Sequence, residues 1–214
     1  MQIKILNRWT NEVLWEGEAE SLRDAVEKAV DTDANLTGAD LTDADLADAN
    51  LAGAKLTRAK LTDAKLTGAD LAGAKLTGAD LAGAKLTGAD LTGAKLTGAD
   101  ITRADLTGAR LTDLGFEIPV VADLDRKVAA AVGDGGEHLD MGHWHHACGT
   151  THCRAGWAIT LAGEAGKVLE QRVGPSVAGA LIYFASTGRP PPNFFTSDAV
   201  ALADIKHCAA EAGA

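Results

Sequence analysis

The sequence predicts a β-solenoid, a chain wound around a narrow core of alanine and leucine, with a cap before it and an α-helical domain after it. Three observations lead to this prediction. Alanine recurs at every fifth position from Ala34 to Ala109, and leucine follows each alanine two residues later, with Ile101 as the single exception. The sixteen units run without a gap. Beyond Asp113 the period is lost and apolar residues recur at helical spacing.

A period of five residues excludes both an α-helix and a flat strand. In a helix, at about 100° per residue, successive leucines would be rotated by about 140° and would scatter around the axis. In a flat strand, successive leucines would point to opposite faces. A short extended segment with a bend in every unit keeps alanine and leucine on the inner side. Four such segments close a square coil of about 20 residues, so the sixteen units predict about four coils.

The predicted core repeats once per coil, because each leucine stacks on the leucine one coil further along the chain. One such stack contains Leu51, Leu71 and Leu91, and Ala69 and Ala89 belong to the stacks of alanines. Alanine leaves room for the leucines, so a leucine in its place should overpack the interior at a cost of about 1 to 3 kcal/mol. Glycine at the unit ends is expected at the corners, where the backbone turns tightly.

The residues that point outward must supply any chemistry of the repeats, and they are expected to form four columns. Two columns lie on opposite sides of the coil and read Asn35, Lys55, Lys75, Lys95 and Asp45, Lys65, Lys85, Asp105. The other two read Asp40, Lys60, Asp80, Asp100 and Asn50, Asp70, Asp90, Arg110. Two interpretations are open: an electrostatic docking surface, or a solvated surface whose neighbouring charges compensate one another.

The units ADLAG, AKLTG and ANLTG resemble the pentapeptide-repeat family, in which alanine, aspartate or asparagine, and leucine precede two small or polar residues. The resemblance covers residues 34–113. It implies a right-handed quadrilateral β-helix, a handedness that the period alone does not supply. Lysine replaces the aspartate or asparagine before leucine in six units, at Lys55, Lys60, Lys65, Lys75, Lys85 and Lys95.

The composition indicates an acidic, soluble protein. The net charge of −10 argues against a general binder of nucleic acid or of anionic membranes, which needs a basic surface. The chain has no apolar run of about 18 residues, and its N-terminus lacks the order of a signal peptide. We therefore expect a cytoplasmic protein with no direct contact to nucleic acid or membrane. Three cysteines, Cys148, Cys153 and Cys208, fit a reducing compartment.

Some pentapeptide-repeat proteins resemble B-form DNA and inhibit DNA gyrase, so the resemblance raises DNA mimicry as an alternative function. Residues 34–113 contain eleven Asp and nine Lys or Arg, a net charge of −2. Duplex DNA carries about one charge per 1.7 Å of its axis, so a stack about 20 Å tall would carry roughly a dozen. The charge of the repeats therefore disfavours mimicry.

Both flanks of the repeats are predicted to be folded segments that cover the solenoid ends. Residues 1–33 should form a hairpin over 2–15, with a polar turn near Thr10 and Asn11, and then a helix whose capping box is Ser21 and Asp24. Residues 114–214 should form an α-helical domain, with helices at about 122–132, 151–170, 175–186 and 197–212. The string CGTTHCRAGWA resembles a segment of uncharacterised bacterial and phage proteins, which implies a module but no activity.

One stretch, from Met141 to Cys153, gathers four of the six histidines and two of the three cysteines. Zinc prefers thiolate and imidazole ligands, so Cys148, His152 and Cys153, with His145 or a neighbouring histidine, are candidate zinc ligands. The spacing matches no standard zinc pattern. A disulfide between Cys148 and Cys153, a nucleophilic Cys153 at a helix N-terminus, and a purely structural role for these residues are the alternatives.

The sequence therefore predicts a non-enzymatic scaffold or protein–protein interaction module, without a cofactor unless the cysteines and histidines bind zinc. Its partner would be a protein. DNA mimicry directed at gyrase and a metal-dependent or thiol-dependent activity of the C-terminal domain are the alternatives.

Overall fold

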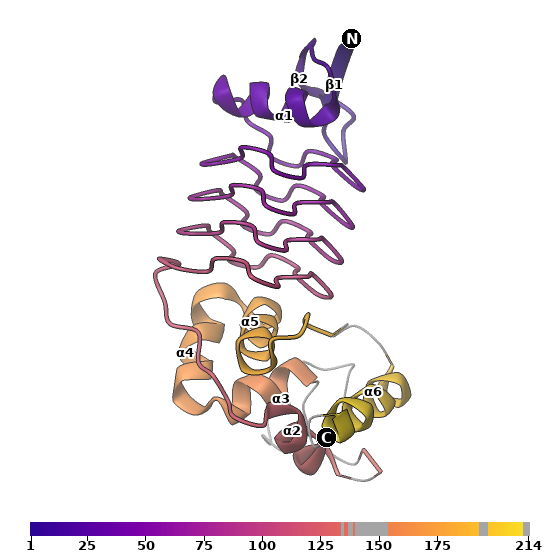
Figure 1. Ribbon diagram of the computed structural model, residues 1–214, viewed down its shortest axis with the longest axis vertical. Coiled ribbons are helices and arrows are strands. Elements are labelled where there is room, and N and C mark those ends of the chain that lie inside the picture. Colours follow the sequence, from indigo (N-terminus) through magenta and orange to yellow (C-terminus); the bar gives the residue numbers. More distant parts are fainter. Residues whose placement is uncertain (134, 137–138, 140–153, 193–196, 212–214) are drawn as a thin grey trace. The chain divides into compact units, whose positions relative to one another are not determined.

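The computed structural model describes the chain except for residues 134, 137–138, 140–153, 193–196 and 212–214. It divides into two compact units, Met1–Phe116 and Glu117–Ala214. The first unit contains the N-terminal hairpin and helix and the stacked coils of the repeat, and the second is helical (Figure 1). No helix in the described parts of the chain is long and apolar enough to cross a membrane.

The repeats form four-sided coils in which each residue lies above the residue twenty positions later (Figure 1). Neighbouring coils are joined by parallel bridges and by backbone hydrogen bonds in both directions. The amide of Leu41 donates to the carbonyl of Lys60 at 2.8 Å, and the amide of Lys60 donates back to the carbonyl of Ala39 at 2.8 Å. The predicted period and its consequence, a stack of coils, are confirmed.

Each corner of a coil is a β-turn closed by a hydrogen bond from alanine to the leucine three residues earlier. At the first corner the amide of Ala39 donates to the carbonyl of Leu36 at 3.0 Å, and Gly38 between them has φ of +73°. A single positive φ at the third turn residue defines a type II turn, which favours glycine there. Arg58 occupies an equivalent corner at φ of +56°, a strained backbone conformation for a residue with a side chain.

The interior of the coils is filled by alanine and leucine. Leu51 and Leu71 are 0% exposed and Leu91 is 1% exposed, and Ala69 and Ala89 are 0% exposed. Each fully buried leucine contributes roughly 1.5 to 3 kcal/mol of transfer free energy relative to leaving it in water. The core that stabilises the stack therefore consists almost entirely of two kinds of side chain, alanine and leucine.

The N-terminal hairpin pairs strand β1, Gln2–Leu6, with strand β2, Val13–Glu18, in antiparallel register. Its turn begins at Asn7, whose side-chain oxygen accepts hydrogen bonds from the amides of Trp9 at 2.9 Å and Thr10 at 3.2 Å. The hairpin continues the first coil, because Asn7 bridges Ala39 and the amide of Asp40 donates to the carbonyl of Leu6 at 2.9 Å.

Helix α1, Leu22–Asp31, follows the hairpin and begins at the predicted cap. The amide of Asp24 donates to the Ser21 hydroxyl at 3.1 Å, and a carboxylate oxygen of Asp24 accepts from the amide of Glu20 at 2.8 Å. Two side chains of α1 replace the missing coil above the repeats. Glu27 accepts from the amide of Asn50 at 2.8 Å, and Arg23 donates to the carbonyl of Ala47 at 3.0 Å. Backbone groups at the open end of the first coil are thereby satisfied.

The second unit contains five helices within the described residues: α2 Leu124–Val132, α3 Arg154–Leu161, α4 Gly163–Val173, α5 Pro175–Thr187 and α6 Asp198–Glu211. Helix α5 is the most apolar of them and contacts α2, α3 and α4, while α6 contacts α2. A side chain on Gly179 of α5 would collide with Ala155 of α3, so the two helix backbones lie close together.

The single helix predicted over 151–170 is wrong, because two helices occupy this segment as far as the structure describes it. Helix α3 ends at Leu161 and α4 begins at Gly163. Gly163 has φ of +64°, the left-handed conformation with which glycine commonly ends a helix. The sequence shows this glycine inside an otherwise helical apolar pattern, and glycine in that context does not by itself announce a break.

Candidate functional site

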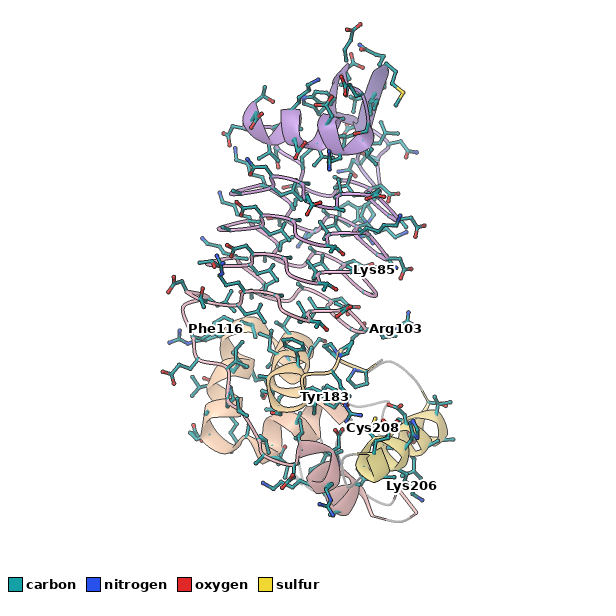
Figure 2. All side chains as sticks on the ribbon, viewed as in Figure 1. Lys85, Arg103, Phe116, Tyr183, Lys206 and Cys208 are labelled. Carbon is teal, nitrogen blue, oxygen red and sulfur yellow. The ribbon has the colours of Figure 1, made fainter. Side chains whose placement is uncertain are left out.

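The outward residues of the repeat form the four predicted columns. Parallel bridges join Asn35, Lys55, Lys75 and Lys95 in succession. They join the other three columns in the same way, each with the members that the twenty-residue step predicts. Figure 2 shows side chains, Lys85 among them, projecting outward from these coils. The fold therefore places like positions of successive coils in straight rows, about 4.8 Å apart.

Three of the four columns contain both acids and bases, and every lysine or arginine in them lies one coil from an aspartate of the same column. Lys65 lies 3.1 Å from a carboxylate oxygen of Asp45, and Arg110 lies 2.7 Å from a carboxylate oxygen of Asp90. In the third such column, Lys60 lies between Asp40 and Asp80. The hydrogen bond from Lys65 is the largest cause that lowers the pKa of Asp45 below its ordinary value.

The column of Asn35, Lys55, Lys75 and Lys95 is different, because it contains no carboxylate. We call these residues together with Arg58 the basic face. Lys55 has one partner just outside the column: its ammonium lies 2.6 Å from a carboxylate oxygen of Asp33, the residue before the first unit. Lys75, Lys95 and Arg58 are exposed and form no ion pair with any residue that the structure describes.

The side chain of Arg58 begins next to the glycine of the following coil. A Cβ atom on Gly78, one coil further on, would lie 3.4 Å from Cγ of Arg58, so this part of the arginine side chain lies beside Gly78. The columns on either side of the basic face carry mainly acids, Asp40, Asp80 and Asp100 on one side and Asp70 and Asp90 on the other. The result is a cationic strip whose two bordering columns are mainly acidic, with Lys60 and Arg110 as their only cations.

The residue before each leucine also has a local role, which depends on its type. Where it is Asp or Asn, its side-chain oxygen accepts a hydrogen bond from the amide two residues later, as Asp70 does from Ala72 at 2.9 Å. Asp40 and Asp100 also accept from the hydroxyls of Thr42 and Thr102, at 2.6 Å and 2.7 Å. Lysine cannot accept such a bond. A lysine at this position therefore lacks the hydrogen bond from the amide two residues later, and it adds a positive charge to the outer surface.

A second arrangement of charged side chains lies within the helical unit. Asp125 of α2 is only 4% exposed, and it accepts a hydrogen bond from the hydroxyl of Tyr183 at 3.0 Å. Its other carboxylate oxygen is paired with Arg189, which also lies 3.4 Å from Glu211. Figure 2 labels Tyr183 on α5 and Cys208 on α6 in this region. Burial opposes the charge of Arg189, but the neighbouring Asp125 carboxylate contributes to raising the pKa of Arg189 above its ordinary value.

These residues border a cleft of about 360 Å³, whose lining includes Asp123, Asp125, Thr187, Arg189 and Glu211. The sequence does not predict this cluster, because its members are 58 and 64 positions apart and share no periodic pattern. The only local signal was an acidic residue in the first turn of a helix, which is common at exposed positions. The buried charge is paired and hydrogen-bonded, as stability requires.

The candidate zinc ligands Cys148, His152, Cys153 and His145 lie outside the described residues. The disulfide and the nucleophilic cysteine proposed for this stretch lie there as well. Among the residues that the structure does describe, no group of three or more His, Cys, Asp or Glu could hold a metal ion. The third cysteine, Cys208, is a free thiol on α6 and is buried.

A stack of bridged coils with an alanine and leucine core defines a repeat protein of the β-solenoid class. The family model described as "Pentapeptide repeats (8 copies)" matches the chain twice in succession, at residues 34–73 and 74–113. Residues 34–113 therefore belong to the pentapeptide-repeat family, whose members fold as right-handed four-sided β-helices. None of the curated proteins matches the chain.

Solved structures similar to this chain include other pentapeptide-repeat proteins. HetL from Nostoc sp. PCC 7120, which is involved in heterocyst differentiation regulation, is 45% identical over 37% of this chain and 37% of its own, with a TM-score of 0.36. A second protein from Nostoc PCC 7120 is 43% identical over 36% of this chain and 64% of its own, also with a TM-score of 0.36. An Arabidopsis thaliana protein of the thylakoid lumen is 40% identical over 34% of this chain and 47% of its own, with a TM-score of 0.26. The match thus spans between about a third and two thirds of these relatives.

Proposed function

We propose that the chain is a non-enzymatic scaffold that binds a protein partner on the sides of its solenoid. The observation that carries this proposal is the basic face. Like charges stacked one coil apart repel one another. In the other three columns every lysine or arginine has an aspartate one coil away, whereas Lys75 and Lys95 have none in their column. Solubility does not need such a row, since the net charge is already −10. A row of cations in which only Lys55 has an ion-pair partner among the described residues is therefore best explained as a surface that a partner covers.

The rigidity of the coils supports the same proposal. Each unit is tied to its neighbouring coils through backbone hydrogen bonds, and the inward side chains are close-packed alanine and leucine. Outward side chains consequently have fixed spacing before any partner arrives, which reduces the ordering cost of binding. The inward positions offer no polar group, so all recognition must use the outer columns.

DNA mimicry has less support than a scaffold. A mimic of duplex DNA needs dense negative charge on its sides, whereas the repeats carry a net charge of −2 and one of their four columns is entirely without acids. A gyrase supercoiling assay tests the alternative, and inhibition at stoichiometric protein would favour mimicry over the scaffold. Zinc analysis of the purified full chain likewise tests the predicted metal site around Cys148.

The scaffold is tested by photo-crosslinking from each side of one coil. A photo-crosslinking amino acid replaces Lys75, Asp80, Lys85 or Asp90 in turn, because these four positions lie one per column in the same coil. The full-length variants are exposed to a lysate of the source organism and illuminated. We expect a crosslinked protein from at least one column and a reproducible difference among columns. The absence of specific crosslinks from all four columns would overturn the proposal.

A further inference from the structure

The basic face has geometric properties that narrow the chemistry of its partner. Lys55, Lys75 and Lys95 lie one coil apart in a straight row, joined through parallel bridges. Arg58 adds a fourth cation at the neighbouring corner, over Gly78. Of these four cations, only Lys55 has an ion-pair partner among the described residues, and that partner is Asp33. Three cations in one narrow strip are thus available to a ligand with negative charges at matching intervals.

We propose that the partner lays an acidic α-helix along the basic face, with the helix axis parallel to the stack of coils. Carboxylates at positions i, i+4 and i+7 of that helix would meet Lys95, Lys75 and the Lys55–Arg58 end of the row. This inference rests on the proposed function and assigns the partner class that would use this column.

The spacing of the row favours a helix over an extended peptide. Two coil steps span about 9.6 Å, at about 4.8 Å each. Seven residues of an α-helix span about 10.5 Å, so three carboxylates on one helix face remain within about 1 Å of the lysine row. Side chains on one face of an extended strand recur at about 6.7 Å, so they drift by almost 4 Å over the same two steps.

The acidic borders favour a narrow partner over a nucleic acid. Asp80 and Asp100 lie in the next column on one side, and Asp70 and Asp90 lie in the next column on the other. An α-helix is about 10 to 12 Å wide with its side chains and can present carboxylates on one side only. A nucleic acid carries phosphates along its whole length and on every side of a duplex, which would bring some of them against these aspartates.

Asp33 acts as an internal competitor for the end of the row. Its carboxylate holds Lys55 at 2.6 Å, and its pKa is lowered chiefly by this hydrogen bond. An incoming carboxylate must displace Asp33 before it can pair with Lys55. Asp33 has φ of +57°, a conformation that asparagine also tolerates, so Asp33→Asn removes the competing charge while preserving the backbone.

The experiment measures binding of a synthetic peptide to the full chain by fluorescence anisotropy at low ionic strength, about 20 mM. The probe is a helical Ala/Gln peptide of about 18 residues with glutamates at i, i+4 and i+7. A second peptide has the same composition with glutamates at i, i+5 and i+10, which spreads them around the helix. We expect the first peptide to bind at least about fivefold more tightly than the second.

Two matched double variants locate the site. Lys75→Gln with Lys95→Gln removes two charges from the basic face, and we expect affinity for the first peptide to fall about tenfold. Lys65→Gln with Lys85→Gln makes the same chemical change on the opposite column, and we expect a change below about twofold. Asp33→Asn should raise the affinity, by about two- to threefold, because it removes the competing charge and leaves Lys55 with only its hydrogen bond to the backbone carbonyl of residue 33.

Equal affinity for the two peptides, or equal losses in the two double variants, would overturn the inference. A single-stranded thymidine oligonucleotide that binds the basic face more tightly than the first peptide would replace the helix with a nucleic acid. If the peptide did not bind but a protein were crosslinked from another column, the proposal of an acidic helix would be wrong and the proposal of a scaffold would stand.

Discussion

The ammonium group of Lys65 lies 3.1 Å from a carboxylate oxygen of Asp45, although the two residues are twenty positions apart. A parallel bridge joins them, so the coil period rather than the local sequence brings the charges together. The hydrogen bond from Lys65 is the largest cause of the lowered pKa of Asp45, and the Ala47 amide is the second. Several other carboxyls of this unit have lowered pKa values for similar reasons, among them Asp24, Asp33, Asp90 and Asp105.

These lowered pKa values predict that acid destabilises the N-terminal unit. Each carboxyl has a lower pKa in the folded state than the value of about 3.9 expected when unfolded, so its contribution to stability is present above that value. The contribution is lost as the pH falls through the folded-state pKa. We expect the free energy of unfolding to be nearly constant from pH 7 to about 5 and to fall between about pH 4 and 2.

Urea unfolding of the full chain at a series of pH values, followed by circular dichroism, measures this dependence. Asp45→Asn is the specific variant, because it should reduce the stability difference between pH 7 and pH 2.5 by the share of one carboxyl. Asp113→Asn, at a carboxyl with no resolved ion pair, serves as its control. Unchanged stability between pH 5 and 2.5 would contradict the prediction.

The repeat could be predicted from the sequence because every unit has the same spacing of alanine, leucine and a bend. Alanine, leucine and a bend in each unit allow one type of coil, so the columns and the buried stack of Leu51, Leu71 and Leu91 followed from counting. The N-terminal cap was also visible, because Ser21 and Asp24 form a local motif. Its contacts to the first coil were not visible, since Glu27 and Arg23 reach backbone groups more than twenty residues away.

The Thr62 hydroxyl predicts a stabilising substitution at Lys60. Its oxygen is buried and has no hydrogen-bond partner among the residues that the structure describes, whereas Thr42 and Thr102 in the same column donate to Asp40 and Asp100. In Lys60→Asn the side-chain oxygen could accept from Thr62 without adding a negative charge to the column. We expect the free energy of unfolding to rise by about 1 kcal/mol, measured by urea denaturation.

Lys60→Gln is the matched control for this substitution. Glutamine removes the same charge, but its amide is one methylene further from the backbone and does not form the short turn contact. We expect no gain from glutamine. If both variants changed stability equally, the charge of Lys60 and not the acceptor for Thr62 would be the cause.

The buried alanines predict that the core tolerates no larger residue. Ala69 is 0% exposed and stacks between the alanines of the coils above and below. Ala69→Leu must displace the coils or force strained rotamers, so we expect a loss of about 1 to 3 kcal/mol. Leu71→Ala in the same coil should cost about 2 to 5 kcal/mol through the cavity that it leaves. Thermal and urea unfolding give both values, and a neutral Ala69→Leu would show that the interior has free space.

The helical unit was less predictable than the repeat, because its structure depends on contacts between distant segments. Gly163 ends one helix through a backbone conformation that its neighbours in sequence do not reveal. The Asp125 cluster joins α2 to α5 and to the chain that follows α5, and no local pattern identifies such a pair. Apolar periodicity predicts that a helix exists, but it does not select the partners of a buried charge.

The buried carboxylate of Asp125 predicts that its removal destabilises the helical unit. It is 4% exposed, holds the Tyr183 hydroxyl at 3.0 Å and is paired with Arg189, which is itself 34% exposed. Asp125→Asn leaves the arginine without its buried countercharge, and we expect a loss of about 1 to 3 kcal/mol, a value reduced by the partial solvation of Arg189. Hydrogen exchange of α2 and α5 amides in the full chain should accelerate.

Two further variants serve as controls. Asp123→Asn, an exposed change two residues away, should have little effect on stability. Tyr183→Phe combined with Asp125→Asn should cost less stability than the sum of the two single variants. Strict additivity would show that the Tyr183 hydroxyl gains no stability from the charge of Asp125, because asparagine keeps an acceptor oxygen but not the charge.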